Sequence, residues 1–252
     1  MIGLLQGLIE WLPISSQGQL VLLMIALLGA EPADAVSLSV YVHVGTGLAA
    51  LIYFRRDVSG ILRSETEPER RLLRFLTLTT VVTGVIGLPL FLFTRTASIY
   101  GEALLGLTGA ALISTGVVER SARQRGYRAV ETVSRGEAFL LGVVQGFSAV
   151  PGVSRSGITT STLLFRGFSG EEALRISFLM SIPAVFAAAT GLAVVEGAPQ
   201  LDLRLIVAVA ASFLSALFSM ELLLRLARRV RFWSLCMVLG VLALLPSIIY
   251  LL

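Results

Sequence analysis

Six long apolar runs dominate the chain, and short polar segments separate them. A helix needs about 20 apolar residues to cross the hydrocarbon core of a bilayer, and each run is long enough to do so. The pattern therefore predicts six transmembrane helices. They cover residues 35–54, 72–94, 99–118, 172–195, 203–224 and 232–252.

Two further apolar regions, 1–29 and 137–165, are interrupted in the middle by polar residues and glycine. Pro13 and Ser16 fall in the first interruption, and Pro151 falls in the second. Non-helical backbone at membrane depth is tolerated only where protein buries it or where it lines a wet cavity. Each region therefore predicts two short helices joined by a polar turn. We expect both to be re-entrant hairpins whose tips meet inside the protein.

The two interrupted regions resemble each other. LLQGLIEWLPISSQG and VVQGFSAVPGVSRSG share a Gln-Gly start, a proline, a serine-rich turn and a closing glycine. The likeness continues into the next apolar run, where Ser39 aligns with Ser177. The pattern predicts a single membrane domain, 1–252, made of two repeats with one hairpin and three spans each. The repeats are 1–119, with hairpin 1–29, and 136–252, with hairpin 137–165.

The arginines indicate how the repeats are oriented. An odd number of spans in each repeat places the second upside down relative to the first, an architecture typical of transporters. Of the 20 arginines, 17 lie in four loops, which the positive-inside rule places in the cytoplasm. This predicts an N-terminus and a C-terminus outside the cell. The four loops are 55–74, 120–135, 166–175 and 225–231.

The composition narrows the class of protein further. Hydrophobic residues make up 56% of the 252 residues and charged residues 14%, against roughly 45–50% and 25% in a soluble domain. A disordered chain and a disulfide scaffold are thereby excluded, and the loop arginines explain the +4 charge without a nucleic-acid partner. We therefore expect an all-α, multi-pass protein of the cell membrane. The sequence leaves homo-oligomerisation open.

Glu10 in the first interrupted region and Arg155 at the tip of the second are clear candidates, because an ionisable residue inside the membrane indicates a functional site. A structural ion pair is the alternative, but one pair does not need so many hydroxyl and amide neighbours. Arginine, hydroxyls and the N-termini of the half-helices are together suited to a phosphate. The neighbours are Ser15, Ser16, Gln17 and Gln19 at one tip, and Ser154, Ser156 and Thr159 at the other.

His43 is the only histidine and lies in the apolar run YVHVGTG. A lone histidine in such a run is more often a packing residue than a catalytic one, and both interpretations stay open. Gln6 and Gln145 begin the two hairpins. We favour hydrogen bonds across the repeat interface over a role in chemistry for these two amides.

The segments QGLIEWLPISSQGQL and QGFSAVPGVSRSGIT resemble the two signature motifs of the undecaprenyl-pyrophosphate phosphatase family, the bacitracin-resistance type of integral membrane phosphatase. PGVSRSG followed by Thr159 is the more specific match, and the likeness spans nearly the whole chain. The resemblance implies hydrolysis of a polyprenyl diphosphate to the monophosphate, which recycles the lipid carrier of envelope glycans. It also implies help from a divalent cation, Mg²⁺ or Ca²⁺. Arg155 would hold the diphosphate, assisted by Ser154, Ser156 and Thr159.

The first motif departs from the family pattern at two positions. The family's motif begins Glu-Gly and ends Gly-His, whereas this chain has Gln6-Gly7 and Gly18-Gln19, so it is a divergent member without the usual histidine. An amide can bind phosphate oxygens but cannot shuttle a proton at neutral pH. We hypothesise that His43 enters the cavity from the neighbouring helix and replaces the missing imidazole.

The residues then divide into roles. Arg155 neutralises charge on the phosphoryl group, Glu10 acts as general base or cation ligand, and Ser16 is the candidate nucleophile. Direct attack by water is the competing route to hydrolysis. Transport of a polyprenyl phosphate by a flippase is the alternative function, because inverted repeats and a binding-only site would suit it equally.

Overall fold

The computed structural model describes residues 1–97, 101–122, 126–199, 202–227 and 233–251. Most of the predicted cytoplasmic loop 225–231 lies outside the described residues, as do Arg123 and Arg125 of loop 120–135. Residues 99, 100, 232 and 252, at the ends of two predicted spans, also lie outside them.

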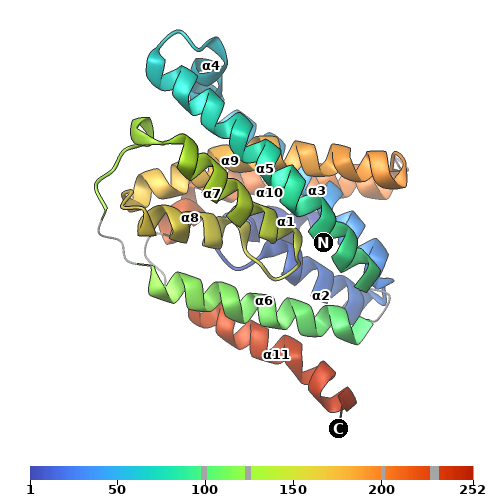
Figure 1. The fold of residues 1–252 in the computed structure, drawn as a ribbon. Coiled ribbons are helices and arrows are strands. Elements are labelled where there is room, and N and C mark those ends of the chain that lie inside the picture. The colour runs from blue at the N-terminus through green and yellow to red at the C-terminus, as the bar shows by residue number, and fades with distance from the viewer. Residues whose placement is uncertain (98–100, 123–125, 200–201, 228–232, 252) are drawn as a thin grey trace.

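The described chain is helical throughout, without a strand in the described ranges, as the sequence predicts (Figure 1). Within the described residues, four helices are long and apolar enough to cross a membrane: α3, α5, α9 and α10. The helices α6 and α11 occupy the other two predicted ranges and pack against each other. The bounds of the long helices are α3 (Pro32–Tyr53), α5 (Glu67–Ala97), α6 (Gly101–Ser121), α9 (Gly170–Glu196), α10 (Leu203–Ala227) and α11 (Trp233–Leu251).

The predicted loop 55–74 is largely helical. Residues Arg55–Arg63 form the short helix α4, and α5 begins at Glu67. The start of α5 is fixed by Thr66, whose backbone N–H donates to the Glu69 carboxylate at 2.8 Å, while its hydroxyl accepts from the Glu69 N–H. This reciprocal capping box lets α5 begin well before its apolar stretch.

Both interrupted regions break into two short helices at the predicted places. The first contains α1 (Ile2–Ile9) and α2 (Ser16–Leu28). The second contains α7 (Arg135–Gly146), the single 3₁₀ turn η2 (Phe147–Ala149) and α8 (Arg155–Phe165). The two turns touch, because the Ser15 hydroxyl accepts a hydrogen bond from the Gly152 N–H at 3.1 Å.

Each half of the chain packs one of its short helices against a long helix of the other half. The first hairpin helix, α1, packs against α10 of the second half, and α7 packs against α5 of the first half. Glycine makes both approaches close: a Cβ at Gly146 would lie 2.7 Å from Ile86, and a Cβ at Gly7 would meet the backbone of α10. The GLLQG and GVVQG segments are therefore helix-packing motifs.

The segment between the halves is anchored by one buried carboxylate, Glu137, at the start of α7. It accepts hydrogen bonds from Arg128 at 2.5 and 3.1 Å and from the backbone and hydroxyl of Ser134. The 3₁₀ turn η1 (Val130–Thr132) lies inside this segment. Burial raises the pKa of Glu137, but the hydrogen bonds from Arg128 and Ser134 outweigh it and hold the pKa below its ordinary value.

Replacing Glu137 by glutamine should destabilise the protein by about 2 kcal/mol, because the paired Arg128 loses its counter-ion and the capping box is weakened. The pKa of Glu137 is lower in the folded than in the unfolded chain, so its contribution is present above the unfolded pKa and is lost as the pH falls. Thermal unfolding in detergent at pH 7 and at pH 4 measures both effects. Equal midpoints for wild type and variant at pH 7 would show that this anchor carries no stability.

Candidate active site

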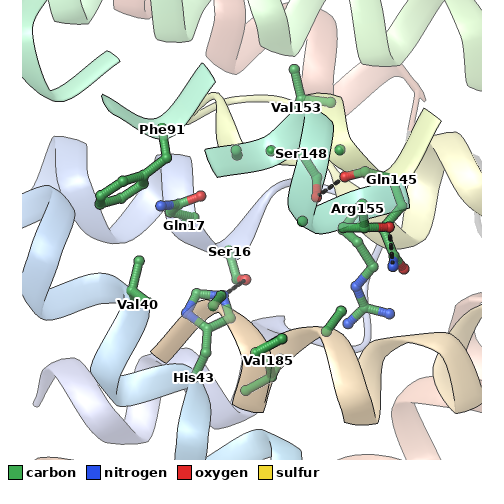
Figure 2. Close-up of a pocket in the computed structure, with 18 of the residues that line it drawn as sticks. Ser16, Gln17, Val40, His43, Phe91, Gln145, Ser148, Val153, Arg155 and Val185 are labelled. Carbon is green, nitrogen blue, oxygen red and sulfur yellow. Dashed lines mark hydrogen bonds between the residues drawn. The ribbon is translucent and has the colours of Figure 1, made fainter. Parts of the chain in front are cut away.

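A cavity of about 360 Å³ lies where the two turns meet, and helices α3, α5, α7 and α9 complete its walls. Its polar end is formed by side chains that the sequence singles out. Figure 2 shows Ser16 and His43 side by side, with the Arg155 guanidinium directed into the same cavity. One end of the cavity is therefore polar, and the remaining walls are mainly apolar.

Glu10 is the centre of the polar end and is 6% exposed. Its Oε1 accepts from Arg155 Nη2 at 2.6 Å. Its Oε2 accepts from the Ser16 hydroxyl at 2.5 Å and from Gln6 Nε2 at 2.9 Å, and lies 3.3 Å from His43 Nε2. The carboxylate thus joins the cation, the hydroxyl and the imidazole in one network.

His43 has a defined orientation within this network. Its Nδ1 lies 2.6 Å from the Ser39 carbonyl oxygen, which can only accept, so Nδ1 carries a proton. In the neutral ring Nε2 is then the basic nitrogen, and it lies 3.3 Å from the Ser16 hydroxyl. The side chain can therefore take a proton from Ser16 or share one with Glu10.

Arg155 is held by groups on both sides. Its Nη1 donates to the Ser177 carbonyl at 3.2 Å, and its guanidinium lies 5.7 Å from the ring centre of Phe178. The Thr159 hydroxyl donates to the Arg155 carbonyl at 2.7 Å and contacts the Ser177 hydroxyl at 2.7 Å. The backbone carbonyls of Ser39 and Ser177, the aligned serines of α3 and α9, thus orient the imidazole and the guanidinium.

Two helices, α2 and α8, have their N-termini at the cavity. Ser15 is the N-cap of α2 and adopts a left-handed conformation with a φ of 59°, and its hydroxyl accepts from the Gly18 N–H. Ser154 is the N-cap of α8, and its hydroxyl accepts from the Gly157 N–H at 3.1 Å. The first residues of these helices are Ser16 and Arg155, so partial positive charge from both ends adds to the guanidinium.

Most of the predicted site residues come together. The cavity is lined by Glu10, Ser15, Ser16, Gln17, His43, Ser154, Arg155 and Ser156. Two predicted substrate contacts are elsewhere. The Gln19 amide donates to the Ile14 carbonyl at 3.4 Å, and Thr159 lies behind Arg155 against Ser177, so neither lines the cavity.

The sequence did not single out the cavity walls on α5 and α7. Gln145 donates to the Thr83 hydroxyl at 3.1 Å, a hydrogen bond between the two predicted repeats, whereas Gln6 donates to Glu10 within its own half. Thr80 and Ser148 lie on the same wall as Gln145. The apolar wall consists of Gly84, Gly87, Leu88 and Phe91 of α5 and Ala184, Val185, Ala187, Ala188, Gly191 and Leu192 of α9. The glycine and alanine residues that cluster in α5 and α9 were the sequence signal that could have indicated this wall.

A half-buried arginine, hydroxyls and helix N-termini surround one end of an apolar cavity in this helical membrane protein, which defines a site of the class suited to anionic lipid headgroups. A family model described as bacitracin resistance protein BacA matches residues 1–245. The chain belongs to this family.

Curated archaeal relatives are similar over almost their full length, and each is named undecaprenyl-diphosphatase. The protein of Methanococcoides burtonii is 41% identical, over 97% of this chain and 95% of its own length. The protein of Methanothrix thermoacetophila is 41% identical, over 96% and 93%. The protein of Haloarcula marismortui is 39% identical, over 95% and 93%.

Proposed function

We propose that this protein is a membrane phosphatase that hydrolyses a polyprenyl diphosphate of the undecaprenyl type to the monophosphate. The observation that carries the proposal is the Ser16 hydroxyl, which contacts both the Glu10 carboxylate and the His43 imidazole beside Arg155. A binding-only site does not need a hydroxyl between two proton acceptors. The names of the relatives favour hydrolysis over the transport alternative.

The apolar wall suits the lipid part of this substrate. Gly84 and Leu88 of α5 and Ala187 and Ala188 of α9 line the cavity and are exposed at the surface of the helices. The cavity therefore opens sideways between α5 and α9, where lipid would surround the protein. Small side chains there leave room for a branched isoprenoid chain, while the diphosphate reaches the polar end.

The first chemical step is transfer of the terminal phosphoryl group to Ser16. The Ser16 oxygen bonds to phosphorus and loses its proton to His43 Nε2 or Glu10, and the bond from phosphorus to the bridging oxygen breaks. The leaving group is the polyprenyl monophosphate, which takes up the proton lost by Ser16 and so leaves His43 Nε2 free for the next step. Arg155 and the N-termini of α2 and α8 stabilise the charge that spreads over the phosphoryl oxygens.

In the second step a water molecule attacks the phosphorylated Ser16. His43 accepts a proton from that water and passes it to the Ser16 oxygen as the bond from phosphorus to this oxygen breaks, so inorganic phosphate and the free hydroxyl form. Acid quenching of the enzyme with terminally labelled substrate should trap label on Ser16, which peptide mass spectrometry can locate. Release of all label without any covalent fraction would favour direct attack by water.

The divalent cation implied by the family has few candidate ligands here. No group of three or more His, Cys, Asp or Glu that could hold a metal occurs among the described residues. Glu10 would be one ligand, and the buried Gln6 Oε1, which has no hydrogen-bond partner within the described chain, would be a second. Mg²⁺ is commonly held by one or two carboxylates plus substrate phosphates, so these residues fit an ion shared with the diphosphate. Such an ion would neutralise phosphate charge when bound.

Chelation should therefore lower phosphate release about tenfold or more, and Mg²⁺ or Ca²⁺ should restore it. The Gln6→Glu variant adds the family's second carboxylate and should reach half-maximal activity at a lower cation concentration. Titrating the cation into chelator-treated wild type and variant measures the restored activity and the cation concentration at half-maximal activity for each protein. Full activity in chelator would contradict a cation requirement.

His43 is proposed to perform the acid–base role of the histidine missing at position 19. The His43→Gln variant keeps a polar side chain but cannot exchange a proton, so phosphate release should fall about 100-fold. The Gln19→Ala variant is the control, because Gln19 contacts only the Ile14 carbonyl among its side-chain partners and should retain activity. A His43→Gln variant as active as wild type would restrict His43 to packing.

We extend the proposal to the arrangement in the membrane. Six crossing helices, two re-entrant hairpins and inverted repeats are supported by the contact between the turns and by the exchange of α1 and α7 between the halves. Both termini would then lie outside the cell. Reporter fusions at each terminus test this, and a cytoplasmic reporter at either end would contradict it.

A further inference from the structure

A groove at the far end of α3 is separate from the catalytic cavity. It is formed by the last turn of α3 and the short helix α4, which folds back beside the start of α5 (Figure 1). The apolar side chains Leu51, Ile52, Val58 and Leu62 form its floor, and Arg55 and Arg63 are the charged residues that line it. Leu62 is 69% exposed although it is apolar, so this surface is suited to contact with an apolar partner.

The charge of the groove is positive. None of its seven lining residues carries a carboxylate, and no ion pair joins Arg55 or Arg63 to a carboxylate within the described residues. Asp57, the acidic residue of α4, is paired with Arg175 of α9. Glu69 is the carboxylate near Arg63, and it is engaged in capping Thr66 at the start of α5. An anion is the complementary ligand.

An apolar space continues from the groove between α4, α5 and α9. Val58 and Leu62 line both the groove and this second space, whose other walls include Leu73, Leu76, Leu179 and Ile182. The arrangement therefore combines two cations at the surface with an adjoining apolar space, the apolar channel. An amphiphile with an anionic headgroup and an aliphatic chain matches both parts, whereas a free anion would leave the channel unused.

We propose that this groove binds an anionic membrane phospholipid, with its phosphate between Arg55 and Arg63 and one chain in the apolar space behind Leu62. A short helix with arginines beside exposed apolar side chains is the pattern of a helix lying in the membrane interface. This assignment does not depend on the phosphatase proposal: none of the seven groove residues lines the catalytic cavity, and Thr80 is the one residue that the apolar space shares with it.

Native mass spectrometry of the purified protein in a non-ionic detergent tests the site, with phosphatidylglycerol and phosphatidylcholine as probes. Wild type should retain phosphatidylglycerol in preference to phosphatidylcholine. The Arg55→Gln/Arg63→Gln variant should bind phosphatidylglycerol about 25-fold more weakly, from about fivefold for each charge. The matched control is Arg56→Gln/Arg204→Gln, which removes the same charge from exposed residues outside the groove and should change binding less than threefold.

Three results would overturn the proposal. Equal losses in the test and control variants would indicate general surface charge, and equal retention of the two lipids by wild type would exclude a headgroup site. Binding of glycerol phosphate as tight as that of phosphatidylglycerol would exclude a role for the apolar channel. Leu62→Gln is a second test variant that keeps both arginines, and it should weaken phosphatidylglycerol binding while size-exclusion elution stays unchanged.

Discussion

Replacing Ser16 by alanine is expected to reduce phosphate release from a polyprenyl diphosphate by about 10⁴-fold or more, because the step that forms the covalent intermediate is lost. Ser16 is the first residue of α2, and its hydroxyl donates to Glu10 at 2.5 Å and contacts His43 at 3.3 Å. Alanine is compatible with the start of a helix, so the fold should persist. Steady-state phosphate release and the acid-stable phosphoenzyme fraction measure the effect.

Ser148→Ala is the matched control for this variant. Ser148 lines the same cavity, but its hydroxyl donates to the Gln145 carbonyl and has no bond to Glu10 or His43. Its activity should stay within a few-fold of wild type. A Ser16→Ala variant that keeps a tenth or more of the activity would show that water attacks the diphosphate directly.

The second large effect is expected at Arg155. The Arg155→Gln variant should release phosphate about 10³-fold more slowly, because a fixed cation at the phosphoryl group is lost. It should also be less stable by about 3 kcal/mol, since Glu10 stays buried without its ion-pair partner. Activity assays and thermal unfolding together separate the two losses.

Arg155→Lys tests the same residue when the glutamine variant does not fold. Lysine keeps the charge beside Glu10. It lacks the planar guanidinium whose two nitrogens donate to Glu10 and to the Ser177 carbonyl. We therefore expect a stable protein that is still strongly impaired. Full activity in either variant would remove Arg155 from the chemistry. Arg204→Gln, at an exposed arginine, should behave as wild type.

Periodicity and length were sufficient to predict the long helices and both interruptions. An apolar run of about 20 residues has few alternatives to a helix, and proline with glycine at Pro13–Gly18 and Pro151–Gly157 breaks it. Helix α4 was not predicted, because its nine residues are mostly polar and a run of arginines is equally compatible with a loop. Its Asp57 pairs with Arg175 of α9, which is distant in sequence.

The polar end of the site was also predictable, because charge and hydroxyls in an apolar region are few. The directions of individual side chains were not. Thr159 follows Arg155 by four residues and hydrogen-bonds back to its carbonyl, which turns it away from the cavity. His43 was ambiguous in the sequence because its distance from Glu10 and Ser16 depends on how α3 packs beside the first turn.

Hydrolysis of a lipid diphosphate by the Glu10–Ser16–His43–Arg155 network underlies the predictions for Ser16, Arg155 and His43. Its most direct test is inorganic phosphate release by the purified wild-type protein from undecaprenyl diphosphate in detergent with Mg²⁺ or Ca²⁺, with the Ser16→Ala variant in parallel. We predict many turnovers for the wild type and almost none for the variant, with polyprenyl monophosphate as the lipid product. Tight binding of the diphosphate by a folded wild-type protein without phosphate release would contradict the claim.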